Sequence, residues 1–456
     1  MAASRTLTFH GGAGTVTGSK YLVTNGSARV LLDCGLFQGQ KELRVLNWEM
    51  PPVSPRSLDA IIVSHGHLDH TGALPLFVKH GYSGPIYCTR STVDLLRIVL
   101  IDAAHLMEED AARANRYGYS KHKPALPLYS KEDVERTMRQ VVPQDWHTPF
   151  EAAVDVTVQY HSAGHILGSA IVDLRLGGHH PLQLVFSGDL GRWDRPIIPD
   201  PELVRRADVL LVESTYGDRE HGTDSEERLV RTVRDTAARG GAVIVPAFAI
   251  GRTQELLWTL SKLEHQGRIP AIPVYLDSPM AIAVTDVYGD QSADRHHEPM
   301  AIEGADFTPL ATPDESKRLN THDGPFIVIA GSGMATGGRV LHHLKERLPS
   351  PKNTVLLPGY QAEGTRGRAL QDGVGSLRMF GEEVEVRAEV VTLDGFSAHA
   401  DKNELMRWLR GFEAPPRHTW VVHGEPPAAA ALAEAVRTSL GWQVEVARRG
   451  ETVALG

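Results

Sequence analysis

From residue 208 onward, unbroken apolar runs of strand length alternate with amphipathic stretches of helix length. The runs include VLLVEST, AVIVPAF, IPVYLDS and PFIVIAGSG, and helices are predicted after them near residues 225–239, 252–265, 280–288 and 339–348. Strands that are apolar on both faces are typical of a parallel sheet with helices on each side. The pattern therefore predicts an α/β fold with a parallel, doubly covered sheet in this part of the chain.

The first 190 residues follow a different pattern. Here VTVQYHSAG returns as SAIVDLRL, as the two strands of a hairpin would. The segment 291–324 is polar and charged, and we expect it to form an irregular surface excursion. A chain of 456 residues has room for two or three domains, since one domain takes roughly 150 residues.

Composition excludes several classes of protein. Hydrophobic residues make up 42% and charged residues 23%, which excludes general disorder. Two cysteines cannot form a disulfide framework, and no run approaches a membrane span or the apolar core of a signal peptide. The net charge of −9 argues against a general coat of nucleic acid but allows a local basic groove. We therefore expect a cytoplasmic protein with no membrane partner.

Histidine is the unusual residue of this sequence, with 22 copies that cluster. The segment HGHLDH (65–70) places three imidazoles and a carboxylate directly after a predicted buried strand. Because alternate residues project to one side, His65 and His67 can hold one ion while Asp69 and His70 turn toward a second. Nitrogen ligands with carboxylate help suit zinc. A histidine-rich surface loop without a metal is the alternative.

Three further strand ends finish on residues of the same kinds. They are His165 in HSAGHILGS, Asp189 in FSGDLG and His423 in TWVVHGE. For any one of them alone, an ordinary turn or core residue would be the safer interpretation. In an open sheet, however, the carboxyl ends of the strands share one edge. We therefore expect all of them to converge on one site for two ions, with Asp189 placed between the ions.

Longer motifs resemble those of a known family. The pattern H-x-H-x-D-H is the metal loop of the metallo-β-lactamase superfamily. ADVLLVESTYGDR, GFSAHAD and VVHGE match motifs A, B and C of its β-CASP branch through Glu213, His399 and His423. PAFAIGRTQELL, IAGSGMATGGRVLHHL and GYQAEGTRGRAL also look like that branch. Over nearly its whole length, the chain resembles β-CASP ribonucleases, the bacterial and archaeal homologues of the endonuclease subunit of the eukaryotic cleavage and polyadenylation specificity factor.

The resemblance implies a fold and a division into domains. The fold would be the metallo-β-lactamase αβ/βα sandwich, with a β-CASP α/β domain inserted into it. Residues 1–207 and 391–456 would form the two parts of the metallo-β-lactamase domain, and residues 208–390 would form the insertion.

The resemblance also implies which residues bind two zinc ions. The ligands of the first ion would be His65, His67 and His165. The ligands of the second would be Asp69, His70 and His423, and Asp189 would be shared. Asp33, in LLDCG, matches a motif that supports the metal loop without binding the ion. Without the resemblance, an ordinary turn carboxylate would be the preferred interpretation of Asp33.

The implied reaction is the hydrolysis of RNA phosphodiester bonds. A hydroxide that bridges the two ions would attack phosphorus. His399, kept protonated by Glu213, would protonate the leaving 3′ oxygen, so that the downstream product keeps a 5′-phosphate. A helix start capped by Ser397 and Asp401 is the plain interpretation of the same segment, and the two interpretations are compatible.

Two glycine-rich turns precede predicted helices. Backbone N–H groups in such turns can bind phosphate, although tight packing is the commoner explanation. Within the resemblance, the residues expected to contact the RNA backbone are Ser332, Gly333, Met334, Thr336, Gln361, Thr365, Arg366 and Arg368, with Arg252 of AIGRTQ added to them.

These expectations define a di-zinc ribonuclease of RNA processing or decay that cuts single-stranded RNA as an endonuclease, with or without exonuclease activity. A DNA-directed nuclease is one alternative, but that branch typically lacks the histidine that stands here as His423. Small-molecule hydrolases of the superfamily lack the pair of Glu213 and His399, and a non-catalytic scaffold would not keep every metal ligand. The resemblance is compatible with a homodimer, for which the sequence offers no interface.

Overall fold

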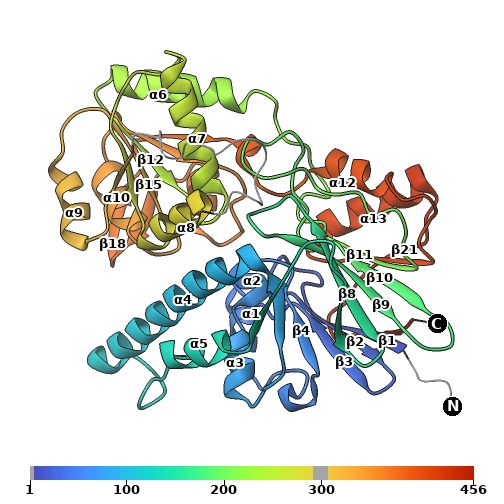
Figure 1. Ribbon diagram of the computed structural model, residues 1–456. Coiled ribbons are helices and arrows are strands. Elements are labelled where there is room, and N and C mark those ends of the chain that lie inside the picture. The colour runs from blue at the N-terminus through green and yellow to red at the C-terminus, as the bar shows by residue number, and fades with distance from the viewer. Residues whose placement is uncertain (1–4, 291–306, 456) are drawn as a thin grey trace. The chain divides into compact units, whose positions relative to one another are not determined.

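Residues 5–290 and 307–455 are described by the computed structural model, and they form two compact units (Figure 1). The first unit comprises residues 1–220 and 399–456, and the second comprises residues 221–398. These boundaries differ from the expected 207/208 and 390/391. Strand β11 (Val209–Val212), expected in the insertion, pairs on both of its edges with strands of the first unit. Strand β19 (Glu389–Thr392) pairs within the second unit, so residues 393–398 follow it there.

The first unit contains two seven-stranded sheets. The strands of the first sheet are, in spatial order, β22 (Thr452–Ala454), β1 (Arg5–Gly11), β2 (Lys20–Asn25), β3 (Ala28–Leu32), β4 (Ala60–Ile62), β5 (Ile86–Thr89) and β6 (Val141–Gln144). Those of the second sheet are β21 (Val444–Val446), β20 (His418–Val421), β11, β10 (Leu182–Phe186), β9 (Ala170–Leu176), β8 (Val156–Ser162) and β7 (Phe150–Ala153). Each sheet is antiparallel at one side and parallel at the other. The hairpin predicted from VTVQYHSAG and SAIVDLRL is the antiparallel pair β8–β9.

Four layers make up the first unit. Alternate residues of both sheets, such as Leu32 and Phe186, form one buried core between the sheets. A second core lies between the first sheet and its helices, and a third lies between the second sheet and helices α12 and α13. The helices are α1 (Lys41–Val45), α2 (Leu68–Thr71), α3 (Leu74–Lys79), α4 (Arg90–Tyr117), α5 (Lys131–Met138), α12 (Lys402–Leu409) and α13 (Pro426–Leu440). This arrangement is the predicted αβ/βα sandwich.

The second unit is built on a six-stranded sheet whose pairs are all parallel. Its strands are, in order, β14 (Phe307–Pro309), β13 (Val274–Asp277), β15 (Phe326–Ala330), β12 (Ala242–Pro246), β16 (Thr354–Leu357) and β19. A separate hairpin of β17 (Ser376–Met379) and β18 (Glu382–Glu385) lies between β16 and β19 in the sequence. The helices are α6 (Ser225–Ala238), α7 (Arg252–His265), α8 (Pro279–Asp290), α9 (Pro313–Arg318), α10 (Val340–Arg347) and α11 (Arg366–Gln371). Short 3-10 turns are η1 (Leu46–Trp48) and η2 (Pro55–Ser57) in the first unit, and η5 (Leu319–Thr321) and η6 (Asp394–Phe396) in the second.

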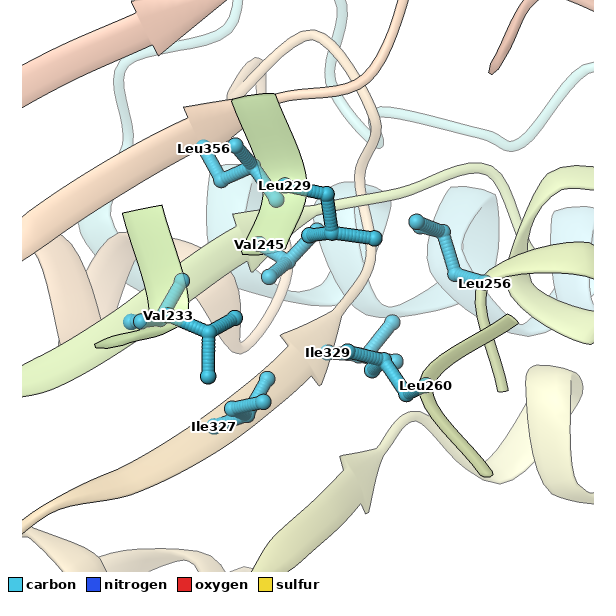
Figure 2. Close-up of a pocket in the computed structure, with 9 residues that line it drawn as sticks. Leu229, Val233, Val245, Leu256, Leu260, Ile327, Ile329 and Leu356 are labelled. Atoms are coloured by element: carbon cyan, nitrogen blue, oxygen red, sulfur yellow. The ribbon is translucent and has the colours of Figure 1, made fainter. Parts of the chain in front are cut away.

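Helices cover this sheet on both faces, as the unbroken apolar runs predict. Odd-numbered residues of β12 and β15 pack with α6 and α7, and even-numbered ones pack with α10. Figure 2 shows the first of these cores, where leucine, isoleucine and valine side chains from α6, α7 and the sheet surround a small gap. Because its lining holds no polar side chain, this gap is a feature of core packing and not a candidate site.

The segment expected to be an irregular excursion is partly regular. Its residues 291–306 lie outside the described part of the chain. Residues 307–309 add an edge strand to the parallel sheet, and α9 begins after Thr312 with a capping box to Glu315. The strand lies at the edge of the sheet, where polar residues are tolerated. Its polar surroundings in the sequence are why no strand was predicted here. Within the described residues, no helix is both long and apolar enough to cross a membrane.

Candidate metal centre

The candidate residues of the first unit lie just beyond the carboxyl ends of strands. Asp33 follows β3, the segment 65–70 follows β4, and His165 follows β8. In the second sheet, Asp189 follows β10, and Glu213 and His423 follow the parallel strands β11 and β20. Parallel strands bring their carboxyl ends to one edge, which is why residues so far apart in the chain meet here.

The first group of metal-binding atoms comes from His65, His67, His165 and Asp189, all within 4.8 Å of one another. His65 Nε2 lies 3.1 Å from His67 Nδ1, which lies 3.3 Å from His165 Nε2. Imidazole nitrogens that face one another this closely need a proton or a cation between them. The three rings therefore form a donor set that fits a transition-metal ion.

The second group comes from Asp69, His70 and His423. His70 Nε2 lies 3.1 Å from His423 Nε2, and Asp69 Oδ2 lies 3.5 Å from the same nitrogen of His423. Asp189 stands between the groups, because its Oδ2 is 3.6 Å from His65 Nε2 and 3.4 Å from His70 Nε2. A buried carboxylate that faces imidazoles of both groups is suited to lie between two cations.

Ionisation also suits these groups to metal binding. Burial lowers the pKa of His67 to about 4 and holds the pKa of His65 well below its ordinary value. Both rings are therefore neutral near pH 7 and offer lone pairs. Burial alone would raise the pKa of Asp189, but the imidazoles around it, His423 first, lower that pKa well below its ordinary value. Asp189 is therefore a carboxylate.

Asp33 belongs to neither metal-binding group but contacts His70 of the second group. Its Oδ2 lies 2.7 Å from His70 Nδ1 and accepts hydrogen bonds from the hydroxyls of Ser64, at 3.0 Å, and Ser19, at 3.1 Å. Its Oδ1 accepts the Ser64 N–H at 2.8 Å. Because the carboxylate holds Nδ1 of His70, the Nε2 of that ring is directed toward His423.

Gly35 allows the chain after β3 to pass against the metal loop. A Cβ atom at this position would lie 1.5 Å from the carbonyl oxygen of Asp69, so the loop would have to move. We expect Gly35→Ala to lower metal affinity and to reduce the free energy of unfolding by roughly 1–3 kcal/mol. Metal content after dialysis and thermal unfolding would measure both effects. Gly375→Ala is the control, because its Cβ would have no neighbour within 4 Å; equal behaviour of the two variants would contradict the prediction.

The side chains of Glu213 and His399, which lie far apart in the sequence, contact each other in the structure. Glu213 is fully buried, and its Oε1 lies 3.2 Å from His399 Nδ1. The backbone N–H groups of Leu190, at 2.7 Å, and Thr215, at 3.0 Å, donate to this carboxylate and hold it in place. His399 Nδ1 is also 3.8 Å from Asp189 Oδ2, so the pair adjoins the metal groups.

Neighbouring carboxylates raise the pKa of the His399 ring. Burial lowers the pKa of His399, but the nearby carboxylates, Glu213 first, raise it by more, and the net pKa lies above its ordinary value. The SAHAD segment is also a helix start, but the N-cap of α12 is Asp401, in a capping box with Glu404, contrary to the expectation that Ser397 caps it as well. The two interpretations of this segment are therefore compatible in the structure.

The two glycine-rich turns of the second unit contact each other. The first connects β15 to α10, and the second connects β16 to α11. The Gln361 side chain donates to the Gly333 carbonyl at 3.1 Å, and the Arg366 guanidinium donates to the Thr336 carbonyl at 3.3 Å. The Ser332 hydroxyl accepts the Thr336 N–H at 2.9 Å. The structure thus joins two segments that the sequence connects only by resemblance.

Three of the expected RNA contacts are engaged within the protein. Gln361 is 2% exposed, so it joins the two turns and does not present its amide to solvent, contrary to its expected contact with RNA. Thr365 caps α11 by accepting the Arg368 N–H at 3.2 Å. Buried Arg252 donates to the carbonyl of Phe396 at 3.3 Å, within the second unit.

Sequence predicts no role for three further residues of the centre, of which Thr215 lies inside motif A. Thr215 Oγ1 lies 3.2 Å from His423 Nδ1, and Ser19 and Ser64 bind Asp33. Ser64 precedes the metal loop, and this adjacency is a signal that sequence could supply. Ser19 lies just before β2 and is held at the site by its backbone, whose N–H donates to the Asp69 carbonyl at 2.9 Å and whose carbonyl accepts the Gly35 N–H at 3.0 Å.

Models of known protein families match three segments of the chain. They are described as a beta-lactamase superfamily domain (residues 28–244), a Beta-Casp domain (residues 253–370) and a Zn-dependent metallo-hydrolase RNA specificity domain (residues 383–447).

Relatives match over nearly the whole chain. Ribonuclease TTHA0252 of Thermus thermophilus is 39% identical, over 97% of this chain and 98% of its own length. An RNase J-like protein of Methanocaldococcus jannaschii is 33% identical over 92% of each chain. Transcription termination factor FttA of Methanosarcina mazei is 32% identical over 98% of this chain and 71% of its own length. A crystal structure of a protein of unknown function from Enterococcus faecalis has the same fold, with a TM-score of 0.56 and 15% identity, over 99% of this chain and 100% of that one.

The sandwich fold and its metal-binding groups define a metal-dependent hydrolase of the metallo-β-lactamase superfamily. The matched models and relatives then give the family: the chain belongs to the β-CASP ribonucleases. The resemblance, the fold class and the enzyme class predicted from sequence, a metal-dependent hydrolase of RNA, are thereby confirmed.

Proposed function

We propose that this chain hydrolyses single-stranded RNA at a centre of two zinc ions and leaves a 5′-phosphate on the downstream product. The observation that carries the proposal is the position of His399 and Glu213 beside two metal-binding groups that share Asp189. Two relatives, a ribonuclease and an RNase J-like protein, support RNA as the substrate. Both endonuclease and exonuclease action are compatible with this arrangement.

The donor atoms support zinc as the metal. Imidazole nitrogens with a few carboxylate oxygens suit this ion, and the matched C-terminal model is described as Zn-dependent. When bound, two such ions lower the pKa of a water molecule and neutralise charge on the reacting phosphate. The residues that would hold them are His65, His67, His165, Asp69, His70 and His423, with Asp189 between the ions. Asp33 would keep the ring of His70 in orientation.

His399 would act as the general acid. Its Nδ1 faces Glu213, so Nε2 is the nitrogen that would deliver a proton to the departing 3′ oxygen. The side chain is 19% exposed while that of Glu213 is fully buried, which suits a proton donor that meets a substrate and a carboxylate that stabilises its charge. Because the bond from phosphorus to the 3′ oxygen breaks, the phosphate stays on the downstream fragment.

The glycine-rich turns would hold the RNA backbone. Backbone N–H groups of Gly333 and Met334, with the guanidinium groups of Arg366 and Arg368, are groups that bind phosphate oxygens, whereas the Thr336 N–H is already donated to the Ser332 hydroxyl. Arg368 is shared with Asp372, at 2.9 Å, so its contribution would be the smaller of the two arginines. Contacts of this kind position a strand without reading bases, which predicts weak sequence preference.

Cleavage of a labelled single-stranded RNA, with DNA of the same sequence alongside, tests the proposed function. We expect the metal-loaded protein to cut RNA and to spare DNA. A chelator should abolish cleavage, zinc should restore it, and the downstream fragments should carry 5′-phosphates. Internal fragments would indicate an endonuclease, and mononucleotides from the first time point would indicate an exonuclease. Intact RNA in the presence of folded, zinc-loaded protein would contradict the proposal.

A further inference from the structure

A second cluster of metal-binding side chains lies in the first unit and shares no residue with the centre described above. His147, His161 and Glu202 each offer a ligand atom within 4.8 Å of the others. His147 Nε2 lies 3.4 Å from Glu202 Oε1, and His161 Nδ1 lies 3.5 Å from Glu202 Oε2. The ring centroids of the two histidines are 5.5 Å apart. Two imidazoles thus face the two oxygens of one carboxylate.

Three separate segments build this cluster. In β8, Val158 and Tyr160 point into the core between the sheets, so His161 points to the opposite face. The backbone N–H of His147 donates to the carbonyl of Tyr160 at 3.1 Å, which holds the β6–β7 connection against this strand. Glu202 is held by an exchange with Ser162, whose N–H donates to Oε1 at 3.1 Å and whose carbonyl accepts the Glu202 N–H at 2.9 Å.

A buried carboxylate stands behind His161. Asp173 of β9 is 4% exposed, and its Oδ2 lies 3.9 Å from His161 Nε2. The amide of Gln183 donates to the same oxygen at 3.0 Å and fixes it. Asp173 Oδ1 is buried and has no hydrogen-bond partner among the described residues. A histidine with one nitrogen toward a ligand cluster and the other toward a carboxylate has the arrangement of metal-binding histidines.

We propose that His147, His161 and Glu202 bind a third divalent transition-metal ion, with Asp173 orienting His161. Two imidazole nitrogens and a carboxylate suit zinc, and cobalt or nickel would take the same ligands. His147 is exposed, so water can complete the coordination. The ion would compensate the charge of two neighbouring carboxylates, one of them buried.

Such an ion would stabilise the segments that hold His165 in position. The segment around Glu202 passes against Gly164, where a Cβ would lie 2.7 Å from the carbonyl oxygen of Pro199. The carbonyl of Glu202 accepts the indole N–H of Trp408, on α12, at 2.8 Å. An ion that joins β8 to this segment would therefore stabilise Gly164, which precedes His165, and helix α12, which follows His399. It would not touch the substrate. Its role would be structural.

A network of ion pairs is the competing explanation. The side chains of Asp173 and Glu202 raise the pKa of His161 to about 9, more than burial lowers it, so an imidazolium would also balance these carboxylates. The two explanations differ in one measurable quantity, the number of ions that the protein binds.

Metal content of the full chain tests the proposal. Wild-type protein is stripped with a chelator, dialysed against zinc at a fixed free concentration, and analysed for zinc per chain. His147→Asn is the main variant, because asparagine tolerates the left-handed backbone that His147 adopts, with φ of 57°. Glu202→Gln is the second variant. His105→Gln is the control, since it removes an exposed imidazole that lies 3.4 Å from the Glu109 carboxylate but belongs to none of the metal-binding groups found among the described residues.

We expect both variants to bind one zinc ion fewer than wild type and the control, and to keep RNA cleavage. The zinc-dependent rise of the melting temperature should be smaller in both variants, and cobalt bound in place of zinc should lose one set of absorption bands. Equal zinc content in wild type and both variants would overturn the proposal in favour of the ion-pair network. Because the readout is a difference of one ion, it stands whether or not the main centre holds two ions or cleaves RNA.

Discussion

Replacement of His399 by alanine is expected to lower the rate of RNA cleavage by about 10²–10⁴-fold, the usual contribution of a general acid. The side chain belongs to neither metal-binding group that would hold the two zinc ions, so the variant should keep its metal content. Its partner, Glu213, is held by two backbone N–H groups and would stay in place. The loss should therefore appear in the chemical step, which single-turnover cleavage of a labelled RNA measures.

A modified substrate separates proton donation from a merely structural role. In an RNA with sulfur in place of the bridging 3′ oxygen at one position, the leaving group is a thiolate, which needs no proton because thiols are far more acidic than alcohols. We expect this substrate to be cut almost equally by wild type and His399→Ala. His122→Ala, which removes an exposed histidine of the first unit, serves as control. An equal defect of His399→Ala on both substrates would assign the residue a role other than general acid.

Replacement of Asp189 by alanine is expected to disrupt both metal-binding groups at once. The carboxylate lies 3.6 Å from His65 Nε2 and 3.4 Å from His70 Nε2, so each group would lose the carboxylate oxygen that faces it. Metal ions contribute several kcal/mol to such a transition state. At about 1.4 kcal/mol per tenfold change, we expect cleavage to fall by roughly 10³-fold or more. Zinc per chain should fall in parallel.

Asp145→Ala provides the matched control for this prediction. Asp145 is an exposed aspartate whose partner, Arg90, donates to it at 3.1 Å on the surface of the same unit. Zinc content and RNA cleavage of this variant should equal those of wild type. If Asp189→Ala kept its zinc and still lost cleavage, Asp189 would act on the substrate and not between the ions.

Elements with strong periodicity were predictable almost to the residue. The helix expected at 252–265 is α7 with the same bounds, and the helix expected at 225–239 is α6, which ends at Ala238. In both, the apolar stripe packs against the parallel sheet, so local pattern and tertiary environment favour the same structure. The domain boundaries were predicted less well. Strand β11 looks like the first strand of the inserted domain, but its partners, β10 and β20, belong to the first unit.

Polar segments were the least predictable part of the fold. Residues 307–309 form a strand although they carry little apolar signal, because pairing with β13 in a sheet edge satisfies their backbone groups. The glycine-rich turns were visible as turns. Gln361 of one turn contacts Gly333 of the other because β15 and β16, the strands before these turns, lie on either side of β12 in the sheet.

The sequence alone determined the chemical kinds of residue that follow each strand, and its longer motifs, through their resemblance to a known family, indicated the class of reaction. Buried strands, the turns that follow them and the ligands HGHLDH are local, because they depend on residues that are close along the chain. Only the tertiary structure decided which of these residues meet. The 3.2 Å contact of Glu213 with His399, the place of Asp189 between two groups, and the cluster of His147, His161 and Glu202 all join distant segments. The place of Asp189 follows from strand order and parallel pairing, which bring strand ends to one edge, and the other contacts follow from how connecting segments pack; no local pattern encodes either.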